Sequence, residues 1–134
     1  MNQLNHYTTQ QIFVIVKPGS LNLVPVIMEM MKQHHWKVSK TIVKKLQISE
    51  AKKLYEVHKD KDFYEDLCKY MASDLSRAFI FTRPGKVSDE AFEEVARLKD
   101  QIRDEYGESD MRNVMHSSDS ISNMMKEASV YFNL

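Results

Sequence analysis

One histidine lies among residue types that could support group-transfer chemistry. His116 stands in "NVMHSSDS", residues 113–120, with an amide before it and hydroxyls and a carboxylate after it. A histidine nucleophile needs a neutral imidazole, a neighbour that fixes its tautomer, and donors that hold an anionic substrate. On an expected later helix, Glu127 could fold back to orient the ring, and Ser118 could bridge the two. By local spacing alone His116 could equally be an exposed residue before a helix capped by Ser118 or Asp119.

The other histidines and the single cysteine offer no comparable site. His34 and His35 are adjacent at the end of an expected helix, so their side chains point about 100° apart and do not easily serve one ion. His6 falls in an expected N-terminal tail. Cys68 lies in an apolar helical pattern, which is typical of a buried and inert thiol. The sequence therefore predicts no structural metal.

Length and charge narrow the class of protein. The 134 residues are enough for one domain with a buried core. Nineteen basic and nineteen acidic residues cancel, so no overall field attracts nucleic acid or an anionic membrane. The N-terminus lacks a signal-peptide pattern, and the longest apolar run, "IFVIV", is too short for a bilayer. We expect one cytoplasmic domain over residues 1–134, with a flexible tail over residues 1–10 and neither nucleic acid nor membrane as a partner.

The elements that position these residues follow from apolar periodicity and from turn signals. Strands are expected at 11–18, 36–48, 75–85 and 111–116, and helices at 23–35, 50–58, 62–73, 89–106 and 120–132. Ser49 and Ser88 are expected to cap two of the helices, because serine side chains accept from free backbone N–H groups. The order βαβααβαβα predicts an α+β, ferredoxin-like sandwich, with a four-stranded antiparallel sheet covered by helices on one face.

Several blocks of the chain together resemble the nucleoside diphosphate kinase family. The blocks are "IFVIVKPGSL", "LYEVHKDKDFYEDLCKYMAS", "QIRDEYG" and "NVMHSSDSISNMMKEASVYF", and the last is similar to the family signature "NxxHGSDS". In that family a histidine takes the terminal phosphate of a nucleoside triphosphate as phosphohistidine and passes it to a nucleoside diphosphate. The resemblance implies that His116 is this nucleophile, that Glu127 and Ser118 orient it, and that Mg²⁺ arrives with the nucleotide.

The resemblance also implies roles for residues that periodicity alone would not single out. Lys17 matches a lysine that contacts the phosphates and the sugar hydroxyl, and Arg103 matches a phosphate-binding arginine. Tyr55 matches a tyrosine close to the catalytic histidine. Phe63 matches the aromatic that stacks on the base, although spacing alone would place both rings in the core. Asn113 matches the amide that touches the ribose.

The chain departs from the family pattern before the "IR" segment. The family has a long loop there, bearing a phosphate-binding threonine, and this loop has no counterpart in the sequence. Arg97 aligns with an arginine that precedes the loop, yet on a continuous helix Arg97 and Arg103 would point about 120° apart. Lys99 would share a face with Arg103. Arg83, in the "TRPGK" turn, is a further donor, so three candidates for the missing contacts stay open.

The missing loop bears on assembly and on activity. In the family it builds the trimer contacts of a hexamer, so we expect a homodimer. An active nucleoside diphosphate kinase is the main hypothesis. The alternative is a kinase-fold module with reduced or no catalytic activity, which senses nucleotides or binds another protein.

Overall fold

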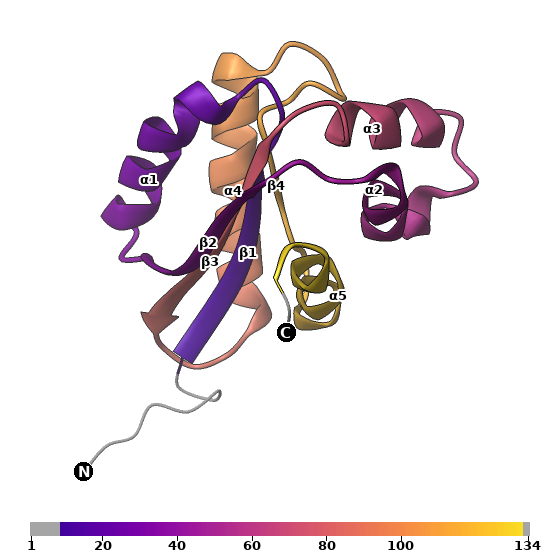
Figure 1. Ribbon diagram of the computed structural model, residues 1–134. Helices are drawn as coiled ribbons and strands as arrows, with labels where there is room; N and C mark the ends of the chain where they lie inside the picture. Colours follow the sequence, from indigo (N-terminus) through magenta and orange to yellow (C-terminus); the bar gives the residue numbers. More distant parts are fainter. Residues whose placement is uncertain (1–8, 133–134) are drawn as a thin grey trace.

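The computed structural model describes residues 9–132, which pack around one hydrophobic core (Figure 1). Its four strands are β1 (Thr9–Val16), β2 (Lys37–Lys44), β3 (Ser76–Pro84) and β4 (Met115–Ser117). Its α-helices are α1 (Val24–Gln33), α2 (Ile48–Leu54), α3 (Tyr64–Met71), α4 (Asp89–Tyr106) and α5 (Ile121–Tyr131). Two 3-10 turns, Leu21–Leu23 and Glu56–His58, lie between them. The predicted order of strands and helices is confirmed.

The sheet has the order β2-β3-β1-β4, and each neighbouring pair is antiparallel. The α+β, ferredoxin-like class is therefore confirmed. β1 begins at Thr9, so Thr9 and Gln10 belong to the sheet and not to the expected tail. The rest of that tail, with His6, lies outside the described residues.

Helices lie on both sides of the sheet, where the sequence predicted one covered face. β1 is buried from Ile12 to Val16, so its two faces both need apolar cover. The Phe13 ring lies 6.0 Å from the ring of Tyr131 and 6.5 Å from that of Phe132, at the end of α5. In Figure 1, α1 lies on one side of the sheet, and α5 lies with α2 and α3 on the other.

Two predicted helix caps are wrong. Gln47, not Ser49, caps α2: its backbone carbonyl accepts from the N–H of Glu50 at 3.0 Å, and the Glu50 carboxylate accepts from the Gln47 N–H at 2.9 Å. Ser120 caps α5, where its hydroxyl accepts from the N–H of Asn123. The sequence had proposed Ser118 or Asp119 for this position, but Ser118 bonds to another side chain in the candidate site.

α4 is the longest helix among the described residues and the one that carries cations toward β4. It runs unbroken for 18 residues. Of the apolar stripe that periodicity predicts, Ala91, Phe92, Val95, Leu98 and Ile102 are buried, whereas Tyr106, the last member, is 38% exposed. It ends at Gly107, where a Cβ would lie 2.5 Å from the carbonyl oxygen of Arg103. A side chain at this position would clash with the last turn of the helix at Arg103, so the backbone there would have to shift. No helix within residues 9–132 is long and apolar enough to span a membrane.

Candidate active site

A hydrogen-bonded triad surrounds the predicted nucleophile. β4 places His116 opposite Ile15 of β1. The Nε2 atom of His116 lies 2.9 Å from Oε1 of Glu127 on α5, and the Ser118 hydroxyl donates to the same oxygen at 2.5 Å. A carboxylate accepts only, so Nε2 of His116 is the protonated nitrogen and Nδ1 keeps its lone pair. The triad therefore holds the imidazole in the tautomer that a nucleophile needs.

Tyr55 closes one side of the triad. It lies where α2 ends and the next 3-10 turn begins, and its ring meets that of His116 edge-on at 6.2 Å. Burial raises the pKa of its phenol, so Tyr55 stays neutral. Its hydroxyl has no hydrogen-bond partner within the described part of the chain. Tyr55 thus shapes the site beside the imidazole and does not supply a proton to it.

Lys17 is a buried cation anchored to the segment before β4. Only 4% of it is exposed, and its Nζ donates to Oδ1 of Asn113 at 2.6 Å and to the carbonyl of Met111 at 3.3 Å. Burial, followed by the nearby charges of Arg103 and Lys99, lowers the pKa of Lys17 to about 7. Both of its protein partners are neutral acceptors. A negatively charged ligand would therefore stabilise the ammonium form of Lys17 more than the protein alone does.

Arg103 and Lys99 carry two further charges from α4. Arg103 donates from Nε and Nη2 to the carbonyl of Met115, at 3.2 and 2.8 Å, which fixes this face of α4 against β4. Burial lowers the pKa of both side chains, and Arg103 lowers that of Lys99 further. Across residues 9–132, neither these two cations nor Lys17 forms an ion pair with a carboxylate. Three charges without counter-ions indicate an anion site.

Lys99 and Arg103 line a cleft of about 640 Å³, a volume typical of sites for small ligands, whereas Lys17 is not among its lining residues. His116 and Glu127 also line this cleft, as does the segment around His58. The cleft therefore joins residues from α2, α4, β4 and α5.

A row of aromatic rings runs from the triad toward solvent. His58 lies 6.5 Å from Tyr55 and 5.6 Å from Phe63, ring centre to ring centre. Phe63, at the start of α3, is 44% exposed, unlike the buried Tyr55. His58 is a cleft residue that the sequence analysis missed, although it stands between Tyr55 and Phe63 in the same block. An exposed ring beside a cationic cleft can offer a flat face to a base.

Two of the three candidates for the missing contacts do not reach the cleft. Arg97 is exposed on α4 and does not line the cleft, as the geometry of a continuous helix predicts. Arg83 is committed elsewhere, because it pairs with Glu94 at 2.7 Å, stacks over Trp36 at 4.1 Å and donates to the carbonyl of His34. Lys99 is the candidate that lines the cleft beside Arg103.

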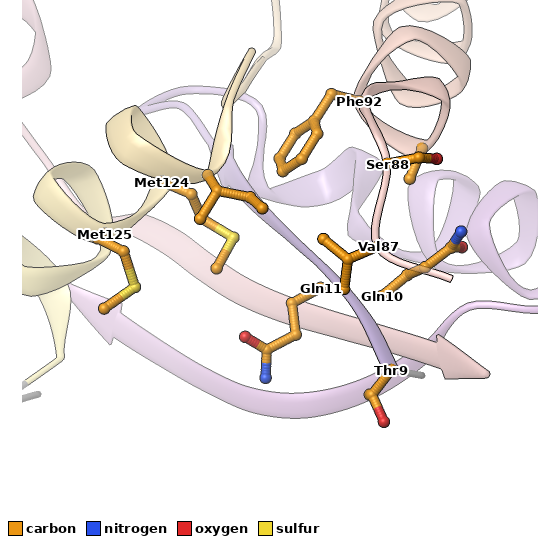
Figure 2. A pocket seen from close by; sticks show the side chains of 10 residues that line it. Thr9, Gln10, Gln11, Val87, Ser88, Phe92, Met124 and Met125 are labelled. Carbon is orange, nitrogen blue, oxygen red and sulfur yellow. The ribbon is translucent and has the colours of Figure 1, made fainter. Parts of the chain in front are cut away.

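A second hollow, of about 330 Å³, lies between β1 and the first turns of α4 and α5. Figure 2 shows Val87, Phe92, Met124 and Met125 around it, with Gln11 of β1 at its edge. Its lining has no ionisable side chain among the described residues. It therefore lacks the groups that phosphate chemistry requires.

Comparison with known proteins agrees with this geometry. Residues 10–134 match the family model described as "Nucleoside diphosphate kinase". The chain belongs to the nucleoside diphosphate kinase family. The resemblance predicted from the sequence blocks is confirmed, and with it the class of phosphotransferase. The comparisons favour the kinase over the alternative of a module without catalysis.

Members of the family cover almost the whole chain. The nucleoside diphosphate kinase of Fervidobacterium nodosum is 31% identical over 132 residues, which cover 92% of this chain and 88% of the relative. The solved nucleoside diphosphate kinase of Aquifex aeolicus has a TM-score of 0.81 at 19% identity, with 92% of this chain and 95% of that one covered. The enzyme of Halobacterium salinarum, solved in complex with CDP, has a TM-score of 0.79 at 22% identity, with 92% and 88% covered. These two structures share the fold described above.

Proposed function

We propose that this chain transfers the terminal phosphate of a nucleoside triphosphate to a nucleoside diphosphate through a phosphohistidine on His116. One observation carries the proposal. Glu127 engages Nε2 of the imidazole and leaves Nδ1 free, in a cleft that also holds cations without counter-ions. A nucleophile with a fixed tautomer beside an anion site fits phosphoryl transfer.

The first half-reaction balances without a proton leaving the site. The Nδ1 lone pair attacks the terminal phosphorus, the N–P bond forms, and the P–O bond to the diphosphate breaks with its electrons on the leaving oxygen. The ring becomes positively charged, while its proton stays on Nε2 against the Glu127 carboxylate. A nucleoside diphosphate then attacks the same phosphorus and restores the neutral imidazole. Because the transition state is loose, positioning and charge neutralisation supply most of the catalysis.

Residues near His116 bind the phosphates, the ribose and the base of the nucleotide. Arg103 and Lys17 neutralise phosphate charge, and Asn113 next to Lys17 contacts the ribose. Phe63 stacks on the base. Since every base has a π face, a stacking contact discriminates little between bases.

Magnesium enters this proposal as part of the substrate. Within the described residues, no group of three or more His, Cys, Asp or Glu side chains could hold a metal ion. Mg²⁺ binds through phosphate oxygens and water as readily as through carboxylates. The nucleoside triphosphate is therefore proposed to arrive as its magnesium complex.

We also propose that the chain works as a cytoplasmic homodimer. β2 is an edge strand, because it pairs only with β3 in the sheet of residues 9–132. Val38 and Val43 on this strand are 39% and 49% exposed. A second copy could cover these two valines, whereas the loop that builds trimer contacts in the family is missing. Sedimentation equilibrium at micromolar concentration tests the assembly, and a monomer would contradict it.

The central test is a labelling experiment with a nucleoside triphosphate carrying a labelled terminal phosphate. The chain should take up acid-labile, alkali-stable label, and His116→Ala should take up none. His34→Ala removes a partly exposed histidine outside the cleft and is the matched control. Addition of an unlabelled nucleoside diphosphate should discharge the label as triphosphate. Absence of label in the wild type would refute the proposal, and label that no diphosphate discharges would refute the second half-reaction.

A further inference from the structure

The long helix α4 brings a second cation to the cleft beside Arg103. Lys99 and Arg103 are four residues apart on one unbroken helix, so their side chains share a face. Both line the cleft that contains His116. Arg103 fixes this face in place through its two bonds to the carbonyl of Met115. Lys99 is thus held on the same side of the cleft as the phosphate-binding arginine.

The other two cations have part of their donor capacity in use. Arg103 donates from Nε and Nη2 to the carbonyl of Met115, so Nη1 is its terminal nitrogen without a protein acceptor. Lys17 donates to Asn113 and Met111 and is almost fully buried. A phosphoryl group in transfer spreads its charge over three peripheral oxygens. A further ammonium beside Arg103 would add three N–H donors to those that Arg103 and Lys17 leave free.

Lys99 has its donors available. Its ammonium forms no hydrogen bond or ion pair with the rest of the described chain, although the side chain is partly buried. Burial and Arg103 lower the pKa of Lys99, while Asp100, Asp119 and Glu127 raise it without forming an ion pair with it. Placing an ammonium beside another cation without a paired carboxylate costs free energy, which an anionic ligand would offset.

We propose that Lys99 binds the phosphoryl group while it passes between the nucleoside triphosphate and His116. This assignment rests on the proposed function and gives α4 the part that the missing loop plays in the family. Lys99 keeps its proton throughout, so its contribution is charge neutralisation and hydrogen bonding to the peripheral oxygens.

Single-turnover labelling of His116 tests the assignment in three variants of the full chain. Lys99→Met should slow phosphorylation about 100-fold, as loss of a donor to a transition-state charge does in other enzymes. Lys99→Arg should recover part of the rate, because it restores a cation. Lys69→Met removes an exposed lysine on α3 outside the cleft and should label at the wild-type rate.

Two further measurements separate binding of the transferred group from a structural role. Lys99→Met should change the Kd for a nucleoside diphosphate less than threefold, because the diphosphate lacks the transferred group, and it should not lower the unfolding midpoint. A Lys99→Met chain that labels at the wild-type rate would overturn the assignment and leave the proposed function intact. A slower Lys99→Met chain that has lost diphosphate binding or stability to the same degree would also overturn it. A wild type that takes no label would overturn the proposed function and this assignment together.

Discussion

Binding of a nucleotide should make the protein take up a proton through Lys17. The pKa of Lys17 in the free protein is lowered to about 7, mainly by burial and then by Arg103 and Lys99. At pH 8 the free side chain is therefore only about 10% protonated. A bound phosphate beside the amine favours the ammonium and raises its pKa toward the ordinary value near 10. The bound state would then be almost fully protonated, so binding should take up about 0.9 proton at pH 8.

Calorimetry in buffers of different ionisation enthalpy measures this uptake directly. The observed heat of binding at pH 8 should differ between Tris and HEPES by the difference of their ionisation enthalpies multiplied by the uptake. The uptake should fall toward zero at pH 5.5, where Lys17 is already charged in the free protein. Equal heats in both buffers at pH 8, or a net release of protons, would refute the reasoning about Lys17. Lys17→Met should remove most of the uptake in any nucleotide binding that it retains.

Other predictions concern the triad, the core and the end of α4. Glu127→Gln should slow phosphorylation of His116 about 100-fold or more in single-turnover assays, because a neutral amide cannot balance the charged ring; an unchanged rate would contradict the triad. Phe92→Ala, at a site 4% exposed, should lower the free energy of unfolding by about 3 kcal/mol in urea titrations. Gly107→Ala should reduce both stability and phosphorylation rate, since its Cβ would lie 2.5 Å from the Arg103 carbonyl oxygen; a wild-type rate would show that the helix end does not position Arg103. The free energy of unfolding should rise between about pH 7 and pH 10, because the unfolded chain binds a proton that folded Lys17 has lost; a fall over this range would contradict the lowered pKa.

Local patterns in the sequence predicted the order of elements and the unbroken α4. The apolar stripe of α4 recurs at helical spacing from Ala91 to Ile102, and such periodicity depends little on distant contacts. Helix caps were harder, because several polar residues compete at each start. Gln47 and Ser49 both stand near the start of α2, but the backbone is extended at Gln47 and helical from Ile48, so Ser49 falls inside the helix. The second covered face of the sheet follows from burial of Phe13, which depends on the position of α5.

In the candidate site, too, some features could be predicted from the sequence and others depend on tertiary contacts. The partnership of His116, Glu127 and Ser118 was expected from the resemblance to the family, whereas local spacing alone left His116 open as an exposed residue before a helix. The lowered pKa of Lys17 could not be predicted from the sequence. It depends on burial and on the charges of two α4 residues, which are distant from Lys17 along the chain. The same holds for Arg83, which a tertiary pairing with Glu94 removes from the list of phosphate ligands.

The position of the phosphate on the imidazole tests the account most directly. The structure engages Nε2 of His116 with Glu127, so the account predicts that the labelled chain, digested at alkaline pH, yields phosphohistidine substituted at Nδ1 and only at residue 116. Chromatography against authentic isomers, together with mass spectrometry of the peptide, gives both results at once. Phosphate on Nε2, or on a residue other than His116, would contradict the account.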